Sequence, residues 1–263
     1  MTQDIHTAVF DLDGTLIRTE DLKDAFKQIA VDYGCTVDEA EEVYRSSRTC
    51  VNKETSKEEM AFSREYFAEK LIAFLKAQKG QNIVEIDFAR LDAVLDERLL
   101  VDGAIELING IQKKGLIYYL ITLGVESWQM EKIKGALLDE YFSFGDEERE
   151  GNILITCNNE REGGRKMVAM REKFGDDFDG SGVVFFNDKP WETKNLALEF
   201  RKLTNFVVRD DRDKRYTEDD FKRAKSETID GGGTFFWSDN LVDLKIEFER
   251  LIETERYYDG TRK

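Results

Sequence analysis

Residues 5–16 read Ile-His-Thr-Ala-Val-Phe-Asp-Leu-Asp-Gly-Thr-Leu, and this stretch decides the fold. The first six residues are mainly apolar, β-branched or aromatic, which predicts a short buried strand. Asp11, Asp13 and Gly14 follow directly, and the glycine lets the chain turn sharply beside the carboxylates. Ligands of an open parallel sheet bind beyond the carboxyl ends of its strands, so this turn marks a candidate site.

The rest of the chain divides into a helical segment and a mixed one. No convincing strand occurs between residues 20 and 98. The helices expected there span 20–33, 37–49, 56–79 and 88–99. From about residue 100, helices alternate with strands, one helix beginning at Pro190. The strands expected there span 116–121, 183–187, 205–208 and 234–237, with a weaker one near 153–157 inside the loop 145–163.

This order predicts an α/β fold with a parallel sheet and right-handed crossovers. The core, a Rossmann-like three-layer domain, would consist of residues 1–19 and 99–263. An all-helical domain, residues 20–98, would be inserted after the first strand. With 263 residues, of which 41% are hydrophobic, the chain is long enough to bury a substantial core.

Composition limits the possible partners and chemistry. The chain has 39 basic and 55 acidic residues, a formal charge of −16, which disfavours binding to nucleic acid or to a membrane surface. The three cysteines form no CxxC pair, and His6 is the sole histidine, so a structural zinc site and a histidine-based triad are disfavoured. No apolar run reaches membrane-spanning length. We expect a reduced, cytoplasmic protein.

Polar residues of one chemical kind follow several of the predicted strands. Thr122 ends the strand 116–121, Asp188 follows the strand 183–187, and Glu192 lies four residues further on. Lys166 begins the helix that leads into the second of these strands. Clustered carboxylates favour a divalent cation with oxygen ligands, such as Mg²⁺, and a cation next to them can bind a phosphoryl group.

These residues resemble the motifs of the haloacid dehalogenase-like (HAD) superfamily. Val9-Phe10-Asp11-Leu12-Asp13-Gly14-Thr15-Leu16 is similar to its first motif, and Leu120-Ile121-Thr122 to its second. Lys166 matches the basic residue of the third motif, and Asn187-Asp188-Lys189-Pro190-Trp191-Glu192 resembles the fourth. The resemblance covers the whole chain, because residues 20–98 stand where the family has a helical cap.

The resemblance implies a role for each matching position. Asp11 would be the nucleophile and Asp13 the general acid and base, while Thr122 and Lys166 would hold the phosphoryl group. Mg²⁺ would be bound by Asp11, Asp13 (through its carbonyl) and Asp188. Two positions depart from the family pattern: Asn187 replaces a glycine, and Glu192 replaces an aspartate, so Glu192 could reach the metal through water. Arg165 competes with Lys166 for the third-motif role.

The implied function is a Mg²⁺-dependent phosphatase that hydrolyses a small phosphorylated metabolite through an aspartyl-phosphate. Asp13 favours phosphate-ester chemistry, since dehalogenases of the superfamily lack an aspartate two residues after the nucleophile. A phosphosugar mutase and a catalytically idle binding protein of the same fold stay open as alternatives. Gly14 and Arg18 are candidate substrate contacts beside the first motif. Residues 210–213 are expected to form a solvated loop.

Overall fold

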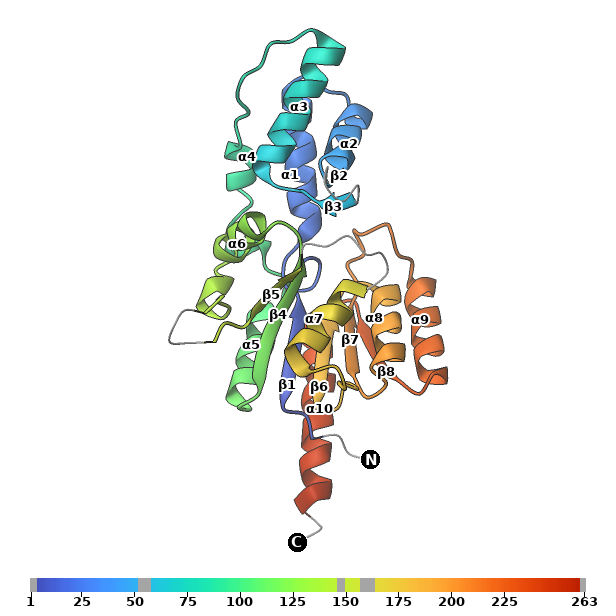
Figure 1. The fold of residues 1–263 in the computed structure, drawn as a ribbon. Coiled ribbons are helices and arrows are strands. Elements are labelled where there is room, and N and C mark those ends of the chain that lie inside the picture. Colours follow the sequence, from blue (N-terminus) through green and yellow to red (C-terminus); the bar gives the residue numbers. More distant parts are fainter. Residues whose placement is uncertain (1–3, 52–57, 146–149, 157–163, 261–263) are drawn as a thin grey trace.

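A six-stranded parallel sheet forms the centre of the computed structural model, which describes residues 4–51, 58–145, 150–156 and 164–260 (Figure 1). Its strand order is β5-β4-β1-β6-β7-β8, so the first strand of the chain lies in the middle. The strands are β1 (Thr7–Asp11), β4 (Ile117–Leu123), β5 (Ile153–Thr156), β6 (Val183–Asn187), β7 (Thr204–Val208) and β8 (Thr234–Ser238). The predicted α/β, Rossmann-like core is therefore confirmed, and the weak strand near 153–157 is the edge strand β5.

Helices cover both faces of this sheet. Helices α5 (Ala104–Lys113) and α10 (Leu241–Gly260) pack together on one face, and α7 (Gly164–Phe174), α8 (Pro190–Glu199) and α9 (Glu218–Asp230) pack on the other (Figure 1). Helix α6 (Glu126–Gly135) and the 3₁₀ turn Leu138–Glu140 follow β4. Within the part of the chain that the structure describes, no helix is long and apolar enough to cross a membrane.

An aromatic ladder fixes the register of four neighbouring strands, β1, β6, β7 and β8. Phe10, Phe186, Phe206 and Phe236 are direct neighbours across β1, β6, β7 and β8. Their rings stack in sequence with centroids 5.0, 5.1 and 5.0 Å apart. A one-residue slip would turn each ring to the opposite face, so this buried ladder strongly specifies how the strands align.

The segment between β1 and α5 lies over the carboxyl ends of the strands (Figure 1). It contains α1 (Thr19–Asp32), α2 (Val37–Ser46), α3 (Arg64–Lys79), the short α4 (Ala89–Asp92) and a 3₁₀ turn at Glu97–Leu99. Ser63 caps the start of α3, and Gly80 ends it in the left-handed region at φ 66°.

The expectation of an entirely helical insertion is wrong in one respect. A small antiparallel hairpin pairs β2 (Thr49–Val51) with β3 (Glu58–Met60), where helices were expected at 37–49 and 56–79. Ser56, read as part of a helix start, lies outside the described residues, and α3 starts eight residues later. The last expected helix, 88–99, contains only α4 and the 3₁₀ turn.

Candidate active site

The carboxylates of the first and fourth motifs meet because β1 lies beside both β4 and β6. Asp11 ends β1, is 2% exposed, and pairs in register with Ile121, so Thr122 stands one residue beyond it. On the other side Phe10 is level with Phe186, which places Asp188 just past the end of β6. Three predicted site residues are thus brought to one edge of the sheet by strand register alone.

Gly14 allows the chain after Asp11 to pass close to Asp188. Its φ of +81° lies in the left-handed region. A Cβ atom there would lie 2.4 Å from Asp188 Oδ2 and 2.8 Å from its Cγ. Any side chain at Gly14 would therefore displace Asp188, and glycine is required by both conformation and space.

Lys166 lies under the carboxylates rather than on the surface of its helix. It is fully buried, with Nζ 3.0 Å from Asp11 Oδ1 and 2.7 Å from Glu192 Oε2. Asn187 Nδ2 also donates to Glu192 Oε2, at 3.1 Å. Glu192, predicted as a metal ligand, is thus placed facing Lys166. Burial would raise the pKa of Glu192, but Lys166 and Lys189 outweigh it and bring the pKa to about 2.

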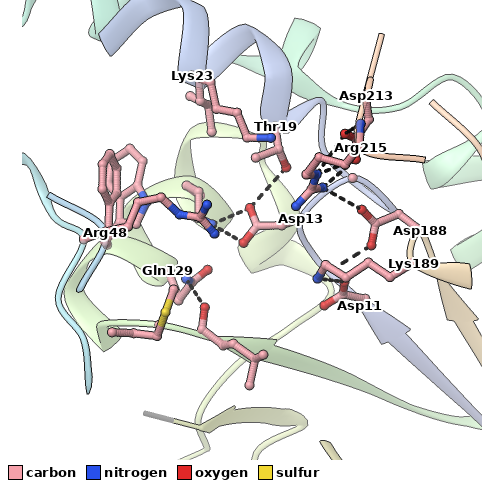
Figure 2. Close-up of a pocket in the computed structure, with 18 of the residues that line it drawn as sticks. Asp11, Asp13, Thr19, Lys23, Arg48, Gln129, Asp188, Lys189, Asp213 and Arg215 are labelled. Carbon is pink, nitrogen blue, oxygen red and sulfur yellow. Dashed lines mark hydrogen bonds and ion pairs between the residues drawn. The ribbon is translucent and has the colours of Figure 1, made fainter. Parts of the chain in front are cut away.

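Two buried carboxylate oxygens face one point in the site. Asp11 Oδ2 and Asp188 Oδ1 accept no hydrogen bond from any described residue. Both lie near Lys189 Nζ, at 3.6 and 3.8 Å, and Figure 2 shows the three side chains converging. Burial, together with the nearby charge of Asp11, raises the pKa of Asp188 to about 7 against the opposing effect of Lys189. Lys189 is thus a distant counter-charge for two buried oxygens that accept no hydrogen bond from the described residues.

The two oxygens fit a hard divalent cation such as Mg²⁺ in donor type and position. Asp11 and Asp188 would hold it, and the backbone carbonyl of Asp13 is nearby in the chain. The described residues contain no group of three or more His, Cys, Asp or Glu side chains arranged as a metal cage. The structure therefore supplies two carboxylates for the ion, since Glu192 is turned toward Lys166.

Asp13 is paired with a lysine that the sequence analysis did not single out. Lys132, on α6, is 2% exposed, and its Nζ lies 2.5 and 2.7 Å from the two carboxylate oxygens of Asp13. Thr19 Oγ1 donates to the same carboxylate at 3.3 Å. Burial alone would raise the pKa of Asp13, but Lys132 holds it below its usual range. Burial also lowers the pKa of Lys132.

Two of the predicted phosphate or substrate contacts, Thr122 and Arg18, do not line the cavity that contains Asp11. Thr122 is completely buried, and its hydroxyl donates to Gln129 Oε1 at 3.2 Å, so the cavity is lined by Gln129 instead. Arg18 forms an ion pair of 2.5 Å with Asp102 and does not line the cavity that contains Asp11. Arg18 is thus turned toward Asp102, and its role as a substrate contact stays a prediction. Arg165, the rival of Lys166, is 8% exposed and lines the cavity.

The loop after β7 also contributes to the site, contrary to the expectation of a solvated loop. Arg215 lies 3.8 Å from Asp188 Oδ2 and pairs with Asp213 at 2.5 Å. Asp210 and Asp213 line the same cavity, and Figure 2 shows Arg215 pointing at Asp188. One feature of the sequence indicated that this loop could border the site: it follows a strand and so lies at the carboxyl edge of the sheet. No spacing in the sequence indicated Lys132, whose partner Asp13 is 119 positions away.

Comparison with known proteins agrees with this arrangement. The family model described as haloacid dehalogenase-like hydrolase matches residues 5–197, well over half of the chain. The chain thus has a hydrolase-type α/β fold with an acidic site at the sheet edge. It belongs to the haloacid dehalogenase-like hydrolase family. No curated protein matches the chain.

Several solved structures share the fold at low sequence identity. A putative haloacid dehalogenase-like hydrolase from Burkholderia xenovorans has a TM-score of 0.56 and 14% identity, covering 95% of this chain and 99% of that one. A HAD family hydrolase from Deinococcus radiodurans, with bound phosphate and sodium, has a TM-score of 0.51 and 14% identity, covering 95% and 97%. A dehalogenase described with an intermediate complex has a TM-score of 0.54 and 15% identity, covering 93% and 97%.

Proposed function

We propose that this hydrolase is a Mg²⁺-dependent phosphatase that cleaves a small phosphorylated metabolite. The observation that carries the proposal is the pair of buried oxygens on Asp11 and Asp188, which accept no hydrogen bond from the described residues and face one point. A bound Mg²⁺ would draw electron density from the phosphoryl oxygens and screen the carboxylates from the anionic substrate.

In the first half of the reaction, Asp11 attacks phosphorus. An Asp11 carboxylate oxygen forms a bond to phosphorus while the bond from phosphorus to the leaving oxygen breaks. The Lys132 ammonium, which keeps Asp13 ionised, gives up a proton that the Asp13 carboxylate relays to that oxygen, and the oxygen leaves as an alcohol. Lys166, whose Nζ lies 3.0 Å from Asp11 Oδ1, pairs with the nucleophile and orients it.

In the second half, water releases the phosphoryl group from Asp11. Asp13 accepts a proton from the water as its oxygen bonds to phosphorus, and the bond between Asp11 and phosphorus breaks. Inorganic phosphate leaves, and both aspartates return to their starting states. Arg215, 3.8 Å from Asp188 Oδ2, would stabilise the negative charge that develops on the phosphoryl oxygens.

We further propose that residues 20–98 form a cap on a core made of residues 1–19 and 99–263. An ion pair of 2.7 Å between Arg212 and Asp21 and the packing of Trp128 against Phe26 join the two parts above the site. Closure of the cap would exclude bulk water during phosphoryl transfer, and opening would release the products.

Hydrolysis of p-nitrophenyl phosphate tests this proposal. We expect activity with Mg²⁺, a loss with EDTA, and a loss on the order of 10⁴-fold in Asp11→Asn, which keeps the shape but removes the nucleophile. Asp177→Asn, a change at an exposed turn, is the matched control and should keep full activity. Activity that survives both EDTA and Asp11→Asn would show that the mechanism is wrong.

A further inference from the structure

Part of the lining of the cavity is built from aromatic rings. Phe26 of α1, Tyr44 of α2, Phe62 after β3 and Trp128 of α6 line it. Tyr44 and Phe62 lie 5.2 Å apart between ring centroids, Phe62 and Trp128 5.9 Å, and Phe26 and Trp128 5.5 Å. All three pairs meet edge to face, the geometry in which aromatic rings attract each other. We call these four residues the aromatic wall.

Only two of the four residues of the aromatic wall are fully buried in the core. Phe26 and Trp128 are 1% and 5% exposed, so they hold the rings in place. Tyr44 and Phe62 are half-buried and still line the cavity, as does Met60, whose flexible side chain can adapt to a ring. Part of the surface of the wall is therefore presented to the ligand space.

This wall lies close to the group that would protonate the leaving oxygen. Lys132 Nζ lies 5.8 Å from the centroid of the Trp128 ring and forms its hydrogen bonds with Asp13. One end of the wall, Trp128, therefore lies beside the ammonium that pairs with Asp13. The cavity has a volume of about 300 Å³, at the lower end of the range for ligand pockets, which suits a single small molecule.

The chemistry of the wall selects among phosphate esters. The hydroxyl groups of a sugar would lose hydrogen bonds to water against these rings, whereas a flat ring gains contact on its face. Arg48 also lines the cavity and extends into it (Figure 2), and a guanidinium can lie over the outer face of a bound ring. We infer that the substrate is a phosphate monoester whose leaving group carries a planar aromatic ring next to the scissile oxygen. This inference rests on the proposed phosphatase function.

Binding of non-hydrolysable analogues tests the inference apart from turnover. Benzylphosphonate and 2,3-dihydroxypropylphosphonate share the phosphonate group and differ in the body that would face the wall. We expect isothermal titration calorimetry with Mg²⁺ to give a dissociation constant at least about 10-fold lower for benzylphosphonate. Equal affinities, or tighter binding of the dihydroxypropyl compound, would overturn the inference.

Two phenylalanine variants separate wall contact from cap stability. Phe62→Ala should weaken benzylphosphonate about 10-fold and change the dihydroxypropyl compound less than about 2-fold. Phe88→Ala is the control, because Phe88 is also half-buried and packs on Phe26 at 6.2 Å but does not line the cavity. It should leave both affinities unchanged. A parallel loss of both ligands in Phe62→Ala, or an equal loss in Phe88→Ala, would contradict the inference.

Turnover distinguishes failure of the inference from failure of the proposed function. Benzyl phosphate and glycerol 3-phosphate both release a primary alcohol, so their intrinsic reactivity is similar. We expect benzyl phosphate to have the higher kcat/KM, by at least about 10-fold. A preference for glycerol 3-phosphate would overturn the inference alone. If neither ester nor p-nitrophenyl phosphate is hydrolysed, the proposed function fails, and the phosphonate affinities still decide which leaving group the wall fits.

Discussion

Two parts of one cavity, which we call its floor and its roof, are held together by different interactions. The floor, at the carboxyl edge of the sheet, contains Asp11, Asp188, the buried Lys166 and the partly exposed Lys189, joined by ion pairs of 2.7–3.8 Å. The roof is the aromatic wall, held by edge-to-face ring contacts. The difference separates two tasks: strand ends place charges for chemistry, while packing between helices sets the shape that a leaving group must match.

The stability of the roof should depend most on Phe26. Its ring contacts those of Phe62 and Phe67, each with centroids 4.8 Å away, and it is 1% exposed. We expect Phe26→Ala to lower the free energy of unfolding by about 3–5 kcal/mol, measured by urea denaturation. Val37→Ala, at a position that is 74% exposed, should change it by less than about 0.5 kcal/mol. A cost below about 1 kcal/mol for Phe26→Ala would mean that the roof is not one packed unit.

Lys132 joins the floor to the roof, and its loss should affect chemistry more than binding. We expect Lys132→Met to lower kcat about 100-fold with little change in KM, because Asp13 would lose the ammonium that orients it and shares its proton. Lys132→Arg should recover part of the loss. Lys134→Met, an exposed lysine on the same helix, serves as the control. A raised KM at constant kcat would instead assign Lys132 to substrate binding.

The Glu192 carboxylate should make the floor sensitive to acid. Its pKa is lowered to about 2 from an ordinary 4.5, so its stabilising effect is complete above about pH 4.5 and is lost as the pH falls toward 2. The stability advantage of the wild type over Glu192→Gln should therefore shrink by on the order of 2 kcal/mol between pH 6 and pH 3. Denaturant titrations of both proteins at pH 6 and at pH 3, without divalent ions, measure this change in stability difference. An advantage that stays constant would show that the ion pair with Lys166 contributes nothing.

Lys189 should oppose metal binding on the floor. Its Nζ lies within 4 Å of the two oxygens that fit Mg²⁺, but the side chain is 23% exposed and can move away. We expect Lys189→Met to lower the dissociation constant of Mg²⁺ about 10-fold in calorimetry without substrate, because like charges repel. Lys202→Met, which removes the exposed ion pair with Asp179, should not change it. Weaker Mg²⁺ binding in Lys189→Met would mean that this lysine holds the carboxylates in position.

Sequence reasoning reached the floor more completely than the roof. Asp11, Asp13 and Asp188 could be placed because each follows a strand, and parallel register brings strand ends together. Phe62 could not be assigned to the cavity, since an aromatic residue at helical spacing has the same pattern in a core and in a ligand wall.

The remaining differences come from short strands and from pairings between distant residues. The hairpin of β2 and β3 has strands of three residues, too short for an alternating pattern to emerge. The contact of Glu192 with Lys166 could not be predicted, because the two residues are 26 positions apart. The ion pair of Arg18 could not be predicted either, because its partner Asp102 is 84 residues away. Such pairings depend on tertiary packing and leave no periodic signal in the sequence.

Trapping the covalent intermediate tests the central claim, that Asp11 is a phosphoryl-accepting nucleophile. Enzyme mixed with Mg²⁺ and a phosphate ester is quenched in acid within milliseconds, digested, and analysed by mass spectrometry. We predict that one phosphoryl group will be found on the peptide containing Asp11, and that it will be absent in Asp11→Asn. Turnover with no phosphorylated peptide at any quench time, or with the phosphoryl group on another residue, would contradict the account.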